Sequence, residues 1–221
     1  MFLVIQRSGY ELIINPYYLL IYRDVRHSSA PLARWTDFHN EDITMVRFYP
    51  DEPGCIVSSS IDGLLCRSHF DALLSPSEES SLQSVIQTGC PIDSFSFVPC
   101  SQVKDLTAVI SPMRTASLLQ LETEEIVTSL GDIRALTRQP DADIISITAN
   151  SSTDCPLIFT SSESGQIGAF LLKDPSGSLE QIATFGGDVH SDTVRSLIYL
   201  EGNGVIYTGG EDSKVVAWSI S

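Results

Sequence analysis

The sequence predicts an all-β protein built from small antiparallel sheets that recur along the chain. Short apolar runs alternate with clusters of Gly, Pro, Asn, Asp and Ser, a pattern typical of brief strands joined by turns. A turn marker also returns at nearly equal intervals, which indicates an internal repeat. No stretch predicts a long amphipathic helix. A helix over residues 123–137 is the weaker alternative, because that segment contains Gly131 and several β-branched residues.

The clearest element is the stretch of residues 186–218. A turn-rich beginning leads into an apolar run at 193–200, and two further apolar runs follow at 205–208 and 214–218. Short polar turns containing Gly separate the three runs, so the segment predicts a three-stranded antiparallel meander.

The same organisation can be traced upstream through the residue that occupies the tight turn. Candidate turn markers recur about every 50 residues, and each has a hydroxyl side chain four residues before it. The markers are Asp62, Thr115, Ser164 and Asp212, and the hydroxyl residues are Ser58, Ser111, Thr160 and Thr208.

The spacing of His190, Thr208, Asp212 and Trp218 resembles that of a WD40-repeat blade. The resemblance implies a β-propeller in which these four side chains form a hydrogen-bonded chain, the structural tetrad. A physical reason supports such a network independently, since a narrow sheet can bury polar groups only if each finds a partner.

The upstream repeats keep less of this pattern. The first keeps a partial tetrad of His39, Ser58 and Asp62. Elsewhere other residues stand at the tetrad places: Ser68 for Trp in the first repeat, Leu121 for Trp in the second, and Ser164 and Phe170 for Asp and Trp in the third.

We predict four repeats, each with one outer and three inner strands, at approximately 30–70, 82–122, 125–173 and 180–221. Residues 18–24 add one leftover strand, so residues 17–221 form a partial propeller and residues 1–16 a non-repeat N-terminal segment. The expected fold is a WD40-type β-propeller with about four four-stranded blades, incomplete or open relative to the seven blades that the resemblance implies. Open strand edges invite pairing. Either the chain is a fragment or variant of a seven-bladed protein, or a dimer or partner covers these edges.

Composition restricts the partners. The chain has 13 Lys and Arg against 28 Asp and Glu, a formal net charge of −15, and 43% hydrophobic residues. It can bury a core, but it lacks the basic clusters that bind phosphates or anionic lipids. We therefore expect protein partners with basic surfaces, and neither direct nucleic-acid binding nor membrane attachment.

The cysteines and the N-terminal residues bear on the compartment. Five cysteines without a C-x-x-C pair predict free thiols in a reducing environment. The apolar opening at residues 1–5 is not preceded by a basic residue, and no apolar stretch reaches the ~20 residues of a membrane span. An intracellular, cytoplasmic or nuclear protein is expected.

No catalytic, cofactor or metal site is predicted. The loops at His39 and His190 have no further His or Cys at ligand spacing, and neither G-x-S-x-G nor a P-loop occurs. The predicted function is a non-catalytic scaffold for protein–protein interaction.

An alternative function rests on Asp24 and Arg26. They resemble the end of the W-D-x-R motif through which some propellers dock to cullin ubiquitin-ligase adaptors, although Arg23 replaces the Trp. The chain would then be a substrate receptor. An ordinary ion pair at the end of a blade explains the same two residues.

The Ser- and Glu-rich stretch at residues 75–81 predicts a surface loop. Its Ser75, Ser77 and Ser80 are candidate phosphorylation sites, and a solvated loop without modification is the alternative.

Overall fold

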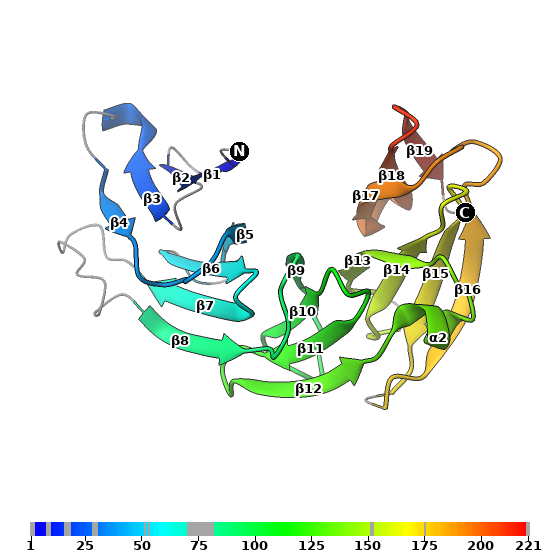
Figure 1. The fold of residues 1–221 in the computed structure, drawn as a ribbon, viewed down its shortest axis with the longest axis horizontal. Coiled ribbons are helices and arrows are strands. Elements are labelled where there is room, and N and C mark those ends of the chain that lie inside the picture. Colours follow the sequence, from blue (N-terminus) through cyan, green and yellow to red (C-terminus); the bar gives the residue numbers. More distant parts are fainter. Residues whose placement is uncertain are drawn as a thin grey trace. The chain divides into compact units, whose positions relative to one another are not determined.

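The computed structural model describes residues 3–7, 10–15, 19–27, 31–50, 52, 54–69, 82–150, 153–174 and 176–219 (Figure 1). The loop with Ser75, Ser77 and Ser80 lies outside them. Among the described residues strands predominate, accompanied by the five-residue helix α2 (Ile133–Thr137) and two 3-10 turns, η1 (Val25–His27) and η2 (Glu201–Asn203). None of the described helices is long and apolar enough to cross a membrane. The predicted all-β class is confirmed.

The chain forms two compact units, Met1–Phe95 and Ser96–Ser221. The first unit holds two four-stranded antiparallel sheets, ordered β1-β2-β3-β4 and β5-β6-β7-β8. Their strands are β1 (Leu3–Arg7), β2 (Tyr10–Asn15), β3 (Leu19–Asp24), β4 (Ala33–Trp35), β5 (Ile43–Phe48), β6 (Cys55–Ser60), β7 (Leu64–His69) and β8 (Leu82–Gln87).

The second unit holds sheets ordered β12-β11-β10-β9, β13-β14-β15-β16 and β17-β18-β19, and β9 begins at the boundary between the units. The strands are β9 (Ser94–Phe97), β10 (Leu106–Ile110), β11 (Ala116–Gln120), β12 (Glu125–Leu130), β13 (Asp143–Thr148), β14 (Leu157–Ser161), β15 (Ile167–Leu172), β16 (Leu179–Phe185), β17 (Val194–Leu200), β18 (Val205–Gly210) and β19 (Val215–Ser219).

Each sequence repeat is offset from the sheets by one strand. A repeat contributes its first strand as the outermost strand of one sheet and its next three strands to the following sheet. Thus β16 completes the sheet of β13–β15, and the chain then continues into β17, β18 and β19. Each sheet is thus built from consecutive strands of the chain, and the boundary of a sequence repeat falls before its last strand.

The first sheet differs from the sequence expectation. Residues 1–16 were expected to lie outside the repeat, with one leftover strand after them. The structure instead pairs β1 with β2 and β2 with β3 to build a full four-stranded sheet. These residues carry no loop His or turn Asp, so only their backbone pairing identifies them with the other sheets.

The turn markers of the second repeat were also misplaced by two residues. Equivalent turns close with a hydrogen bond from Gly63 N to Ser60 O, from Arg114 N to Ser111 O, from Gly165 N to Ser162 O and from Ser213 N to Gly210 O. The four donors all have positive φ. Ser111 therefore lies in the turn, and Val109, Met113 and Leu119 take the hydroxyl, Asp and Trp places predicted for Ser111, Thr115 and Leu121.

The misplacement has a simple physical cause. A shift of two residues leaves the alternation of strand faces unchanged, so the apolar pattern could not reveal it. Ser58, Thr160 and Thr208 do occupy matching places, the fourth residue of β6, β14 and β18 respectively.

The core of the second unit lies between consecutive sheets. Ala108, Ile110 and Leu118 of one sheet pack with Ile158 and Phe170 of the next. One sheet further on, the apolar set Leu157, Phe159, Ile167, Ala169 and Leu171 packs with Val194, Ile206, Leu197, Tyr199 and Trp218. Full burial of such a side chain contributes about 1.5–3 kcal/mol, so these two layers hold the unit together.

Aromatic residues fill the core of the first unit in another way. Trp35 and Phe38 stack with ring centroids 5.8 Å apart, in a cluster with Ile56 and Cys66. Ile56 is the cross-strand neighbour of Ser68, which stands at the tetrad Trp place. Trp35, on β4 of the first sheet, thus supplies aromatic bulk against the β5–β8 sheet, which lacks the Trp found in the last sheet.

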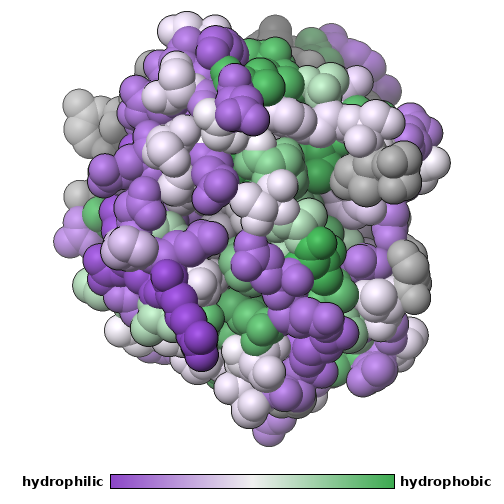
Figure 2. Space-filling model, turned by 90° about the vertical axis from the view of Figure 1, so that its right-hand side faces the viewer, coloured by the Kyte–Doolittle hydropathy of each residue, from purple (hydrophilic) through white to green (hydrophobic). Residues whose placement is uncertain are grey.

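The surface combines polar and apolar residues. Figure 2 shows the side on which Figure 1 labels β16, where hydrophobic residues lie between hydrophilic ones. Ile182 on β16 and Ile126 on β12 are among the exposed hydrophobic residues of the outermost strands.

Candidate functional site

The last sheet brings the four predicted tetrad residues together. Asp212 lies in the turn between β18 and β19, and both of its carboxylate oxygens are within 3.2 Å of His190 Nδ1. His190 Nε2 is 2.8 Å from Thr208 Oγ1. Trp218 Nε1 donates to the same hydroxyl oxygen at 2.9 Å.

One assignment of protons satisfies this whole chain. The Trp218 N–H donates to the Thr208 oxygen, and the Thr208 O–H donates to Nε2 of a neutral imidazole. His190 then donates its Nδ1–H to Asp212. His190 and Thr208 are buried. If one tetrad residue were removed, water could therefore not replace the hydrogen bond that its neighbour loses.

Asp212 stays ionised well into acid. Burial alone would raise its pKa, but the amides of Ser191 and Lys214 and the ring of His190 lower the pKa to about 2. Ser191 N donates to Asp212 at 3.0 Å and Lys214 N at 3.1 Å. The carboxylate therefore anchors the loop after His190 to the β18–β19 turn.

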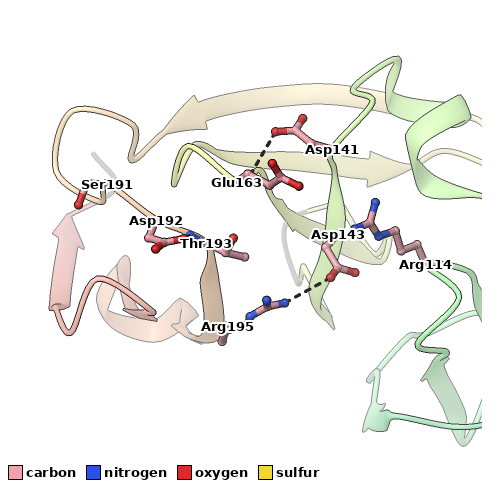
Figure 3. A pocket seen from close by; sticks show the side chains of 8 residues that line it. All are labelled: Arg114, Asp141, Asp143, Glu163, Ser191, Asp192, Thr193 and Arg195. Atoms are coloured by element: carbon pink, nitrogen blue, oxygen red, sulfur yellow. Dashed lines mark hydrogen bonds and ion pairs between the residues drawn. The ribbon is translucent and has the colours of Figure 1, made fainter.

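This anchored loop forms one wall of a pocket of about 500 Å³ that is lined by residues of the last three sheets (Figure 3). Helix α2 and β13 are separated by the loop that carries Asp141, and the β14–β15 turn carries Glu163. The lining residues are Arg114, Asp141, Asp143, Glu163, Ser191, Asp192, Thr193 and Arg195.

Four carboxylates and two guanidinium groups line the pocket, so it is negatively charged on balance. Arg195 NH1 lies 3.6 Å from Asp143, and Arg195 Nε donates to Glu211 at 2.6 Å. Asp141 accepts from the backbone N–H of Glu163 at 3.1 Å (Figure 3). These contacts fix the walls while leaving carboxylate oxygens available for a cationic group.

Two hydroxyl groups, on Ser191 and Thr193, also line the pocket, and among the described residues neither hydroxyl makes a hydrogen bond to a lining carboxylate. The nearby His190 ring is engaged at both nitrogens by the tetrad. Within the described residues, no group of three or more His, Cys, Asp or Glu side chains is arranged to hold a metal ion.

Sequence reasoning missed this pocket. Its charged residues come from four separate segments between Arg114 and Arg195, and none of them belongs to a recognisable motif. The one signal that could have indicated the pocket is the position of its acidic residues in the chain. Asp141 and Asp192 lie in the loops before β13 and β17, and Glu163 lies in the turn between β14 and β15.

The partial tetrad of the first repeat is looser than the last one. His39 Nε2 is 2.8 Å from Ser58 Oγ, but His39 Nδ1 is 3.5 Å from Asp62. Asp62 instead accepts from the amides of Asn40 and Leu64, at 2.8 and 2.9 Å. The loop anchor is thus kept although the ring contact is weaker.

In the third repeat the network is absent. Thr160 occupies the hydroxyl place and is fully buried, and its Oγ1 has no hydrogen-bond partner among the described residues. Phe170 stands at the Trp place, and Gly168 leaves room beside it, since a Cβ there would lie 2.6 Å from the Phe170 ring.

Burial lowers the pKa of His39, and the nearby Asp62 only partly offsets this effect. The folded protein therefore resists a proton that the unfolded chain accepts below about pH 6.5. We expect the free energy of unfolding to fall as the pH decreases from 7.5 to 5.5. Urea unfolding at both values should show a smaller decrease for His39→Asn. An unchanged pH dependence in that variant would contradict this account.

The predicted docking residues Asp24 and Arg26 pair with each other. Arg26 Nε and NH2 contact the two oxygens of Asp24 at 2.8 and 2.7 Å, and the Arg26 amide also donates to Asp24 at 2.9 Å. The contacts lie where β3 passes into η1. The Arg26 side chain is more than half exposed.

Comparisons with known proteins agree with the propeller fold. No protein-family model matches the chain. It is 25% identical over 207 residues to the uncharacterized WD repeat-containing protein C63.06 of Schizosaccharomyces pombe, and 26% identical over 208 residues to WD repeat-containing protein GTS1 of Arabidopsis thaliana. These matches cover 89% and 86% of this chain.

Solved structures give the same fold at lower identity. A chain in the crystal structure of the Mitotic Checkpoint Complex matches with a TM-score of 0.69 at 11% identity, over 99% of this chain and 61% of that one. The computationally designed Ika8 protein matches with a TM-score of 0.64 at 13% identity, over 98% and 57%. The β-propeller class predicted from the sequence is confirmed.

The chain spans 61% and 50% of the lengths of the two WD repeat-containing relatives. This similarity supports a relationship between the chain and the WD40 family.

Proposed function

We propose that the chain is a non-catalytic WD40-type scaffold that binds other proteins through the charged pocket lined by its last three sheets. One observation carries the proposal: a tetrad with every hydrogen bond made holds the 190–193 loop in place beside a pocket lined by four carboxylates and two guanidinium groups. A rigid, charged, concave surface of this kind suits recognition of another protein.

The pocket favours a partner with a basic segment. Four carboxylates face two guanidinium groups, and the whole chain carries a formal net charge of −15. A Lys or Arg side chain entering the pocket would compete with Arg195 for Asp143, whose contact at 3.6 Å is long for a direct hydrogen bond. Electrostatic attraction would also speed association at low salt.

The test compares two variants with the same change in net charge. Asp143→Asn, Glu163→Gln and Asp192→Asn together remove three pocket carboxylates. Glu122→Gln, Glu124→Gln and Glu125→Gln remove three at the β11–β12 turn, outside the pocket. Binding of a fluorescent Lys/Arg-rich peptide should weaken about tenfold, or about 1.4 kcal/mol, in the first variant and less than about twofold in the second. Equal losses would mean that only total charge matters.

The proposal includes two finer assignments. The amino-acid sequence of residues 186–218 is similar to that of the WD repeat-containing protein 89 group, and we propose that the chain is related to that group. The five cysteines are free thiols, which suits an intracellular, cytoplasmic or nuclear site of action.

A second candidate function is that of a substrate receptor for a cullin-type ubiquitin ligase. The exposed Arg26 side chain at the end of β3 supports it, and its ion pair with Asp24 supports the simpler reading of a local structural contact. Loss of adaptor binding in Arg26→Ala, with unchanged peptide binding at the pocket, would favour the receptor function. Unchanged adaptor binding would remove its basis.

A further inference from the structure

The charged pocket contains an arginine that the proposed function does not use. Arg114 lines the pocket and is half-buried. Among the described residues its guanidinium group makes no hydrogen bond and no ion pair, and no dashed line reaches it in Figure 3. A guanidinium group keeps its charge in a protein, so a half-buried one favours an anionic partner. Arg114 is thus a candidate for binding an anion.

The backbone of Arg114 is fixed from two sides. Its N–H donates to Ser111 O at 3.0 Å, and its carbonyl oxygen accepts from Ile133 N at 3.0 Å. The first bond closes the turn between β10 and β11, and the second ties that turn to the beginning of α2. The side chain therefore starts from a defined place at the edge of the pocket.

Two carboxylates near Arg114 are held by other arginines. The pKa of Asp132 is lowered to about 2, chiefly by hydrogen bonds from Arg134 and to a smaller extent by the charge of Arg114. Arg134 Nε lies 2.8 and 3.0 Å from the two oxygens of Asp132. Asp143 is approached by Arg195 at 3.6 Å. The guanidinium group of Arg114 therefore remains available to an anion from outside the chain.

The rest of the pocket offers the opposite charge. The carboxylate of Glu163 makes no hydrogen bond or ion pair within the part of the chain that the structure describes. Asp192 accepts from the amide of Thr193 at 2.7 Å through one oxygen. Figure 3 shows Asp192 and Arg114 on opposite sides of the pocket. The pocket thus presents a cation and two carboxylates that do not neutralise one another.

We propose that the pocket binds a dipolar segment of a partner protein. A Lys or Arg side chain of the partner lies between Glu163 and Asp192, and an anionic side chain next to it in the partner, a carboxylate or a phosphate, pairs with Arg114. This inference rests on the proposed function and names the chemistry of the partner. Carboxylate and phosphate both accept two parallel hydrogen bonds from a guanidinium group. A pocket of about 500 Å³ is within the size range of small-ligand sites.

The overall charge of the chain predicts the opposite preference. With a formal net charge of −15, the protein repels an added anionic group on a peptide at long range. A gain in affinity from such a group must therefore come from a local contact, and Arg114 is the lining residue proposed to make it.

The test uses three fluorescent Lys/Arg-rich peptides that differ at one position beside a lysine, where they carry Ser, Glu or phosphoserine. The wild-type protein should bind at least one of the two anionic peptides about tenfold more tightly than the Ser peptide. Arg114→Gln should abolish this gain and bind the Ser peptide at least as tightly as the wild type does. A gain with Glu identifies a carboxylate as a sufficient anion, and a gain with phosphoserine alone identifies a phosphate.

Arg138→Gln is the matched control. Arg138 also has a positive φ, 58° against 64° for Arg114, and it lies outside the pocket. Both substitutions remove one positive charge at the same kind of backbone position, so Arg138→Gln should keep the gain. Binding of the Ser peptide by Arg114→Gln shows that the pocket still forms in that variant.

The outcomes separate this inference from the proposed function. Anionic peptides that bind the wild-type protein no more tightly than the Ser peptide would overturn the dipolar segment and leave a pocket for basic residues. A gain that Arg114→Gln retains would overturn the role of Arg114. The proposed function fails by a different result, namely equal losses of Ser-peptide binding when carboxylates are removed inside and outside the pocket.

Discussion

Replacing Thr208 by Val is expected to destabilise the protein by about 3 kcal/mol, whereas the same replacement of Thr160 should change stability by less than about 0.5 kcal/mol or increase it. Thr208 serves both His190 Nε2 and Trp218 Nε1, so its loss leaves two polar groups without a partner. Thr160 occupies the equivalent place, but its hydroxyl has no partner among the described residues. Urea unfolding of the two variants measures the difference.

The comparison isolates the hydrogen bonds from the methyl groups. Both threonines are fully buried in the fourth position of a middle strand, so both substitutions change the same atoms in a similar setting. Equal destabilisation would mean that burial of the new methyl group, and not the tetrad, dominates. A double variant with Trp218→Phe should add little to Thr208→Val, because the two residues share one network.

Gly165→Ala is expected to cost about 3 kcal/mol or more, against about 1 kcal/mol for Gly89→Ala. The two glycines have nearly equal positive φ values, 78° and 80°, so both substitutions carry the same backbone strain. The two positions differ in the room available for an added Cβ. A Cβ on Gly165 would lie 2.7 Å from both Cβ and O of His190, whereas nothing lies within 4 Å of one on Gly89.

The Gly165 variant should also weaken peptide binding at the pocket. Gly165 closes the turn that carries Glu163 and presses against the loop of His190, so a displaced turn moves two walls of the pocket together. Thermal unfolding and peptide titration of both alanine variants test this account. Equal destabilisation would show that strain alone, and not the contact with His190, makes glycine necessary.

The sequence predicts this fold well where structure is set by neighbouring residues. The last repeat carries its own turn residues and alternating strands, and β17, β18 and β19 lie within one or two residues of the predicted runs. The four tetrad side chains were identified from spacing, because a turn of fixed length between β18 and β19 fixes their separation.

Prediction failed where a local pattern permits two registers or leaves no marker. A two-residue slip in the second repeat preserved the apolar alternation, and the positive φ of Arg114 that reveals the true turn cannot be read from an Arg. β1 pairs with β2, and β2 with β3, through backbone groups that carry no sequence signal.

The charged pocket was beyond local reasoning for a different reason. Arg114 and Arg195 are separated by more than one full repeat, and only the packing of consecutive sheets brings them to the same cavity. A prediction of that site requires the sheet-to-sheet register, which depends on long-range contacts.

The one-strand offset between repeat and sheet has a consequence for how the molecule can change. Deleting one whole repeat, β12–β15, removes the outermost strand of one sheet and three strands of the next. β16 could then take the place of β12, because both are outermost strands of their sheets. A deletion of one whole sheet, such as β13–β16, would likewise leave the neighbouring sheets complete, because each sheet is built from consecutive strands of the chain. Limited proteolysis between β15 and β16 should leave the two fragments associated, because these two strands pair with each other.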